Sequence, residues 1–318
     1  MNCVYGPAPS RRLGQSLGVD PVPFKTCNYN CVYCQLGRTT PLTNERKEYV
    51  PCDEILAQLG HAIAESGSGA VDYVTIVGEG EPLLYAKLGR LIREARKLTN
   101  LPLAVITNGS LMFLPEVRDD LVEADVVIPS LDAADQETFR RINRPWPRLK
   151  VADIIDGLAT FRKVFRAELW IEVMLIRDLN DTESALSELA WALDRIRPDQ
   201  LHLNVPVRPP AEEWVVGADE EGLIRAMAIL GQVASVVPPD GGELVLRPDA
   251  QPVEAVLDII ARHPLRERDL IAALEGGWPR RVGRILAILA AQPGARRRLY
   301  RGEAFWTCTD GDHSASIP

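Results

Sequence analysis

The 318-residue sequence contains no apolar run long enough to cross a bilayer, and its first residues, MNCVYGPAPSRR, lack the apolar core of a signal peptide. We therefore expect a protein that is neither exported nor embedded in a membrane. Cysteine is also scarce. Three of the six cysteines are scattered singly, at Cys3, Cys52 and Cys308, without the regular spacing of a secreted disulfide framework. A reducing cytoplasm is the expected location.

An excess of positive charge is missing as well, because the net charge is -8. This argues against attraction to nucleic acid over the whole surface. Residues 251–318 are the exception: they carry ten arginines and eight acidic residues, a balance of +2, which leaves -10 for the rest of the chain. A local basic patch is therefore compatible with the C-terminal part. The sequence shows no internal repeat and no low-complexity segment.

Short apolar, β-branched runs alternate with segments of helical period from Ser16 to about Val207, which predicts an α/β fold with a parallel sheet. Functional residues in such sheets collect at the carboxyl ends of the strands. The six predicted strands are SLGVDPV from Ser16, DYVTIVG from Asp72, PLAVITNG from Pro102, DVVIPSLD from Asp125, LWIEVMLI from Leu169 and QLHLNVPV from Gln200.

A change of composition divides the chain. The stretch VVPPDGGELVLRPD is rich in Pro, Gly and Asp and indicates a linker or an exposed hairpin. We expect a first domain at residues 1–237, a linker at 238–250 and a second domain at 251–318. The second has three helical patterns followed by two alternating strands around Gly302, an order that resembles a winged helix.

Three closely spaced cysteines lie in CNYNCVYCQLG, where Cys27, Cys31 and Cys34 form a C-x3-C-x2-C pattern after the first predicted strand. A structural zinc site needs four ligands, and the nearest further ones, Cys52 and His61, have no paired spacing. Disulfides would leave one thiol over. A 4Fe-4S cluster held by three thiolates leaves one iron open to a substrate or cofactor. The pattern favours the cluster, with zinc as the alternative.

The pattern resembles the hallmark of the radical S-adenosylmethionine (SAM) superfamily, C-x3-C-x-aromatic-C, which Cys27, Cys31, Tyr33 and Cys34 match. The resemblance covers about residues 4 to 210. It implies a partial (β/α)6 barrel whose open iron chelates SAM. One electron from the cluster then cleaves SAM to methionine and a 5'-deoxyadenosyl radical, which abstracts hydrogen from a substrate. A flavodoxin or ferredoxin is the implied electron donor.

Three further elements resemble superfamily motifs for SAM. The turn GEGEP places Gly80 and Glu81 where a Gly-Gly-Glu-Pro-like turn is expected, with Glu79 in place of the first glycine. The resemblance implies that Glu81 accepts a hydrogen bond from the SAM ammonium. The elements ITNGS and PSLDA contribute further implied cofactor contacts, which are Thr107, Asn108 and Ser130. The alternative for each element is ordinary turn and helix-cap chemistry.

Strand alternation selects two more candidates. Glu172 shares a strand face with Met174, and the opposite face is apolar, so we expect Glu172 to face the barrel interior, paired, as a contact of SAM or substrate. Asn204 shares a face with His202 in the next strand; His202 is expected to be a core histidine. Arg208 follows this strand and binds either an anionic substrate group or Glu212 or Glu213.

The opening SRRLGQSLGVD and the cysteine motif most resemble iron-sulfur oxidoreductases described as similar to wybutosine-biosynthesis enzymes, although the cysteines for a second cluster are absent. Three functions stay open. The chain is a radical SAM enzyme acting on RNA or a peptide presented by the C-terminal domain, a radical SAM enzyme acting on a small metabolite with that domain as lid, or a non-catalytic iron-sulfur or zinc regulator. Arginines clustered around the expected wing, in an otherwise acidic chain, favour RNA, whereas the apolar third helix pattern disfavours reading of base edges.

Overall fold

The structure is a computed structural model that describes residues 1–67, 69–231, 233–238, 244, 246 and 251–308. Residues 4–236, here called the α/β unit, form an eight-stranded sheet in the order β1 to β8. Strand β1 is antiparallel to β2, and all later neighbours are parallel. The strands are β1 (Val4–Ser10), β2 (Gly14–Val19), β3 (Tyr73–Ile76), β4 (Leu103–Thr107), β5 (Val126–Pro129), β6 (Glu168–Met174), β7 (Gln200–Asn204) and β8 (Ala234–Val236).

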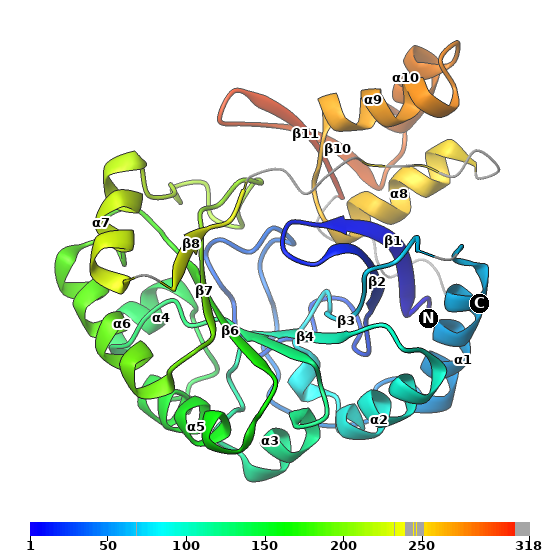
Figure 1. Cartoon of the computed structure of the whole chain (residues 1–318). Helices are drawn as coiled ribbons and strands as arrows, with labels where there is room; N and C mark the ends of the chain where they lie inside the picture. Colours follow the sequence, from blue (N-terminus) through cyan, green and yellow to red (C-terminus); the bar gives the residue numbers. More distant parts are fainter. Residues whose placement is uncertain (68, 232, 239–243, 245, 247–250, 309–318) are drawn as a thin grey trace.

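Helices connect the parallel strands and lie along the outer side of the curved sheet (Figure 1). They bury apolar residues against it, as Ile55 and Leu59 of α1 do, one helical turn apart. None of the helices in the described ranges is long and apolar enough to cross a membrane. The helices are α1 (Cys52–Glu65), the 3-10 helix η1 (Pro82–Leu84), α2 (Leu88–Leu98), α3 (Pro115–Leu121), α4 (Gln136–Ile142), α5 (Val151–Val164), α6 (Glu183–Ile196) and α7 (Glu220–Leu230).

The six predicted strands are confirmed as β2 to β7, and the fold class is α/β with a mostly parallel sheet. The sequence analysis missed the two edge strands. Strand β1 contains Gly6, Pro7 and Pro9, which are rare inside sheets but tolerated at an edge, where backbone donors need no second neighbour. Strand β8 has only three residues, two of them exposed, and therefore shows no apolar alternation.

Residues 251–308, here called the C-terminal unit, pack around a separate core that includes Val256, Leu270 and Leu289. A three-stranded sheet in the order β10, β11, β9 lies against three helices. The predicted linker, 238–250, lies outside the described residues except for 238, 244 and 246. The elements are α8 (Pro252–Arg262), β9 (Leu265–Arg266), α9 (Glu267–Gly277), α10 (Val282–Ala290), β10 (Ala295–Tyr300) and β11 (Glu303–Cys308).

The C-terminal unit lies beside β1, on the inner side of the sheet and opposite the layer of helices (Figure 1). The contacts that join it to the α/β unit include an ion pair and a hydrogen bond near the strand ends. Arg262 of α8 pairs with Glu79 at 3.1 Å, and both side chains are about 15% exposed. The hydroxyl of Tyr300 donates to the carbonyl oxygen of Pro206 at 3.2 Å. The C-terminal unit therefore faces the edge of the sheet where functional residues were expected.

Candidate functional site

A cavity of about 430 Å³ opens at the carboxyl ends of the parallel strands. The three cysteines line it, and so do Tyr33 and Glu172. We call it the thiol cavity. Loops from opposite ends of the sequence form its wall, because the segment after β1, the turn after β3 and the start of the C-terminal unit all contribute residues. Of the predicted cofactor residues, Gly80 lines it too. The others do not line the cavity, and these are Glu81, Thr107, Asn108, Ser130 and Asn204.

The three cysteines are free and half-buried, and each sulfur has at least one nearby N–H donor. Burial raises the pKa of Cys27 to about 12 and also raises the pKa of Cys31, so both are thiols until a cation binds them. The donors are the Tyr29 backbone N–H at 3.4 Å and Asn108 Nδ2 at 3.7 Å for Cys27, Asn143 Nδ2 at 3.5 Å for Cys31, and Lys25 Nζ at 3.3 Å for Cys34.

The described residues offer no ready site for a single metal ion. Within the described residues, no three His, Cys, Asp or Glu side chains lie close enough together to hold one metal ion. A structural zinc draws four ligands to about 2.3 Å of one centre. An iron-sulfur cluster instead distributes its ligands over several irons, so its thiolates lie farther apart. The donor set of three thiols with N–H neighbours therefore suits a cluster.

The GEGEP turn packs against the two residues that precede the first cysteine of the motif. A Cβ atom added at Gly80 would lie 2.2 Å from the carbonyl oxygen of Thr26, so only glycine allows this approach. The same oxygen accepts the backbone N–H of Glu81 at 2.8 Å, and the N–H of Lys25 donates to the carbonyl oxygen of Glu79 at 2.9 Å. The turn therefore packs directly against the residues that precede Cys27.

Glu81 is the fourth residue of this turn, and its side chain is buried, with 1% exposed. Its carboxylate accepts the backbone N–H groups of Leu83 at 2.9 Å and Asn108 at 2.7 Å, and the hydroxyl of Thr107. Burial raises its pKa to about 7, although these hydrogen bonds act in the opposite direction. The structure thus joins Glu81, Thr107 and Asn108 to one another. Glu79, rather than Glu81, presents a carboxylate to the thiol cavity.

Asp132 organises the other side of the motif and was not selected from the sequence. It is 3% exposed and accepts hydrogen bonds from the hydroxyl of Tyr33 and from Asn143 Nδ2 at 2.6 Å. Because Asn143 also donates to Cys31, the carboxylate links two positions of the cysteine motif. Its place in PSLDA was the available signal. Ser130, the residue chosen from that element, donates its backbone N–H to the carbonyl oxygen of Thr107 at 2.9 Å.

Glu172 faces the thiol cavity from β6, and its carboxylate is paired there. Arg12 NH1 lies 2.8 Å from its Oε2, and both side chains are 13% exposed. Asn204 Nδ2 donates to the other carboxylate oxygen. Arg12 was missed because it belongs to a segment that the sequence analysis left unassigned, far from Glu172 in the chain. His202 is 6% exposed and contacts the edge of Trp170, in the core rather than in the cavity.

Arg208 lines the thiol cavity but does not pair with Glu212. Glu212 instead accepts both Nε and NH2 of Arg38 at 3.0 Å, and NH1 of Arg144. Arg208 NH1 donates to Gln35 Oε1 at 2.9 Å. The expected ion pair with Glu212 is therefore wrong, because two other arginines occupy that carboxylate.

Comparison with known proteins identifies the family. The sequence model of the radical SAM superfamily matches residues 22–190, which is more than half of the chain. This chain belongs to the radical SAM superfamily. A 4Fe-4S cluster and bound SAM are typical of that superfamily, and membership supports an enzyme. The three cysteines fall within the matched range.

Two curated relatives extend the comparison. The chain is 34% identical over 273 residues to UPF0026 protein MJ1312 of Methanocaldococcus jannaschii, covering 84% of each protein. It is 40% identical over 223 residues to a protein of Brachyspira hyodysenteriae named GTPase Obg, covering 70% of this chain but only 32% of that protein. Neither relative's name indicates a wybutosine-like subgroup, so that finer resemblance stays a prediction.

Solved structures agree with the fold. A radical SAM methyltransferase from Sphaerobacter thermophilus superposes with a TM-score of 0.55 at 20% identity, covering 70% of this chain and 66% of that one. Streptococcus suis SuiB bound to S-adenosylmethionine superposes with a TM-score of 0.50 at 16% identity, covering 66% of this chain and 45% of that one. These likenesses show the α/β fold shared by radical SAM proteins.

Proposed function

We propose that this chain is a radical SAM enzyme in which Cys27, Cys31 and Cys34 hold one 4Fe-4S cluster. The cluster and SAM, when bound, supply one-electron cleavage of SAM to methionine and a 5'-deoxyadenosyl radical that takes hydrogen from a substrate. The observation that carries the proposal is the convergence of the three free thiols on one cavity at the strand ends of a radical SAM chain.

The residues around the thiols suit this role. Lys25, Asn108 and Asn143 direct N–H groups at the three sulfurs, and such donors stabilise a thiolate over a thiol. Tyr33 is fixed by its hydrogen bond to Asp132 and so keeps the motif in one conformation. The C-terminal unit covers part of the cavity, which limits the entry of water to a reactive site.

The experiment is anaerobic reconstitution of the full chain followed by reduction in the presence of SAM. We expect about four irons per chain and slow release of 5'-deoxyadenosine without substrate. Replacing Cys27, Cys31 and Cys34 by alanine is expected to abolish both. The matched control is Cys308→Ala, which removes a thiol outside the motif and leaves both unchanged. A SAM-cleaving triple variant contradicts the proposal; a count near eight irons indicates a second cluster.

We also propose that the C-terminal unit is a winged helix that contributes to substrate choice. Its arginines at positions 280, 281, 284, 296 and 301 are exposed, which supports an RNA or peptide substrate. The outward side of α10 offers mostly small or apolar side chains, such as Ile288 at 40% exposure, so sequence-specific reading of bases has no support. A flavodoxin or ferredoxin is the proposed electron donor.

A small metabolite is the second candidate substrate, with the C-terminal unit as lid. Arg262 and His263 of that unit line the thiol cavity itself, and Tyr300 contacts the loop after β7. A lid needs such contacts, whereas a docking surface alone does not. The non-catalytic regulator is disfavoured, because GEGEP and the complete cysteine motif are both positioned around a cavity large enough for a ligand.

A further inference from the structure

Two arginines on the wall of the thiol cavity form no ion pair with a carboxylate of the described residues. Arg11 follows β1, Arg208 follows β7, and both are half-buried. Arg11 NH1 lies 3.5 Å from the carbonyl oxygen of Pro238, and Arg208 NH1 donates to Gln35 Oε1. Among the described residues, neither guanidinium forms an ion pair with a carboxylate.

The acidic residues that lie near this part of the cavity are engaged by other cations. The negative charge of Asp269 acts on Arg208 against the surrounding positive charges, although the two side chains form no ion pair. The occupied pairs are Glu172 with Arg12, Glu79 with Arg262, Glu303 with Arg266 and Arg268, and Glu212 with Arg38 and Arg144. The two guanidiniums therefore need an anion that the described chain does not supply.

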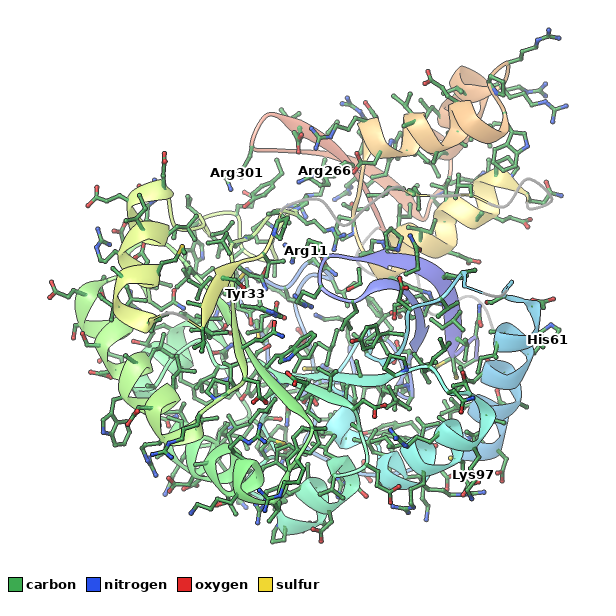
Figure 2. All side chains as sticks on the ribbon, in the orientation of Figure 1. Arg11, Tyr33, His61, Lys97, Arg266 and Arg301 are labelled. Atoms are coloured by element: carbon green, nitrogen blue, oxygen red, sulfur yellow. The ribbon has the colours of Figure 1, made fainter. Side chains whose placement is uncertain are left out.

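Burial and neighbouring positive charges make these two charged guanidiniums unfavourable without an anion. Burial, and then the positive charges of Arg11 and Arg266, lower the pKa of Arg208 to about 10. Burial and the charges of Arg12 and Arg266 also lower the pKa of Arg11. Cations that are packed together and partly removed from water are unfavourable unless an anion joins them. Figure 2 shows Arg11 beside strand β1, with Arg266 of the C-terminal unit above it.

His263 adds a polar group to the same wall. It follows α8 and lines the thiol cavity beside Arg208. Burial, with the charges of Arg208 and Arg262, lowers its pKa to about 3, so the ring is neutral near pH 7. A neutral imidazole can donate one N–H without adding charge. The wall therefore offers two planar guanidinium forks and a neutral donor, contributed by both units of the protein.

We propose that Arg11 and Arg208 bind a phosphate group of the substrate between the α/β unit and the C-terminal unit. Guanidinium forks match phosphate oxygens in paired hydrogen bonds, and two of them balance a doubly charged phosphate better than a single carboxylate. The inference rests on the proposed function, because it names the substrate class of that site. The phosphate belongs either to a monoester of a small metabolite or to the phosphodiester backbone of RNA.

The test measures phosphate binding to the anaerobically reconstituted full chain at saturating SAM, by titration calorimetry with adenosine 5'-monophosphate and with inorganic phosphate. We expect saturable binding that the variant carrying Arg11→Gln and Arg208→Gln weakens at least about tenfold for each arginine lost. The matched control carries Arg140→Gln and Arg166→Gln, which remove the same charge from exposed positions of the α/β unit outside the cavity. The control is expected to bind as the wild type does.

Two results overturn the proposal. One is equal binding of both phosphate probes by the wild type and the cavity variant, or no saturable binding by either. The other is competition between phosphate and SAM in the wild type, which assigns the two arginines to the cofactor carboxylate. If the double variant does not fold, Arg208→Lys replaces it, because lysine keeps the charge but loses the planar fork; about tenfold weaker binding is then expected.

A third probe, a short single-stranded RNA without terminal phosphates, separates the two sources. Weaker RNA binding in the cavity variant assigns the site to a phosphodiester, whereas weaker binding of adenosine 5'-monophosphate alone assigns it to a monoester. Both outcomes support the phosphate site. Failure of the proposed function is separate, because SAM cleavage by the wild type is measured without any phosphate probe. Phosphate bound through Arg11 and Arg208 by a protein that leaves SAM intact contradicts only the proposed function.

Discussion

The α/β unit and the C-terminal unit use charged residues in different ways. In the α/β unit, buried carboxylates such as Glu81, Asp132 and Glu172 each have at least two hydrogen-bonding or charged partners, and those partners lie close to the cysteines. In the C-terminal unit, Arg280 and Arg284 are exposed around α10. The comparison indicates that charged residues of the α/β unit fix the positions of groups around the cysteines. Those of the C-terminal unit form an exposed basic surface.

The largest expected effect concerns Glu81, whose alanine variant removes the acceptor for Leu83, Thr107 and Asn108. We expect Glu81→Ala to weaken SAM binding by about 1.5 to 3 kcal/mol, the range for hydrogen bonds to a charged group. The carboxylate positions the turn and Asn108, so Glu81→Gln is expected to recover part of the affinity. Equilibrium dialysis with SAM measures both variants, and an affinity equal to that of the wild type in Glu81→Ala contradicts this role.

The buried carboxyl of Asp20 is expected to make the stability of the α/β unit depend on pH. Burial raises its pKa from 3.8 to about 7. The folded state therefore binds a proton more tightly than the unfolded state, and this group's contribution to stability falls as the pH rises from about 4 to about 7. The slope is at most about 1.4 kcal/mol per pH unit. Urea unfolding between pH 4 and 8 measures the free energy of unfolding, which is expected to fall less steeply with pH in Asp20→Asn than in the wild type. Equal slopes in the two proteins contradict this contribution of Asp20.

A smaller effect is expected where the two units meet. Glu79→Gln removes the charge that pairs with Arg262, and we expect a loss of about 1 kcal/mol in the docking of the C-terminal unit. Limited proteolysis is the measurement, because a C-terminal unit that docks less tightly is cleaved from the α/β unit more readily. Glu94→Gln is the matched control, since Glu94 pairs with Lys97 on the surface of α2. Equal cleavage of the two variants contradicts a docking role for Glu79.

The smallest effect concerns the exposed arginines. If the C-terminal unit binds RNA, replacing Arg280, Arg284 and Arg296 by serine is expected to reduce the slope of log affinity against log salt by about 2, since each phosphate contact on single strands contributes about 0.7. Affinity is expected to fall to a similar degree for all sequences. Fluorescence anisotropy with pooled tRNA at several salt concentrations measures this slope. An unaltered slope in the variant shows that these three arginines do not contact RNA phosphates.

Local pattern was sufficient to predict the six central strands and the cysteine motif. Periodicity and motif spacing are properties of short windows, and β2 to β7 lie in such windows. The pairing partners were not predictable in the same way. Arg12 and Glu172 are far apart in the chain, as are Tyr33 and Asp132, so neither pair leaves a local signal. Lys25 was missed for a different reason, because its contact with Cys34 depends on a left-handed backbone at φ 57° that the sequence does not reveal.

The division of the cavity wall between two hydrophobic cores has an evolutionary consequence. Cys27 and Cys31 pack against the core of the α/β unit, whereas Arg262 ends α8, a helix built on the core of the C-terminal unit, and His263 follows it. A substitution in α8 or in the residues that follow it changes the shape of the cavity without altering the packing around the cysteines. Descendants of such a protein can therefore acquire a new cavity shape by varying one unit while the half that carries the cysteine motif is inherited intact.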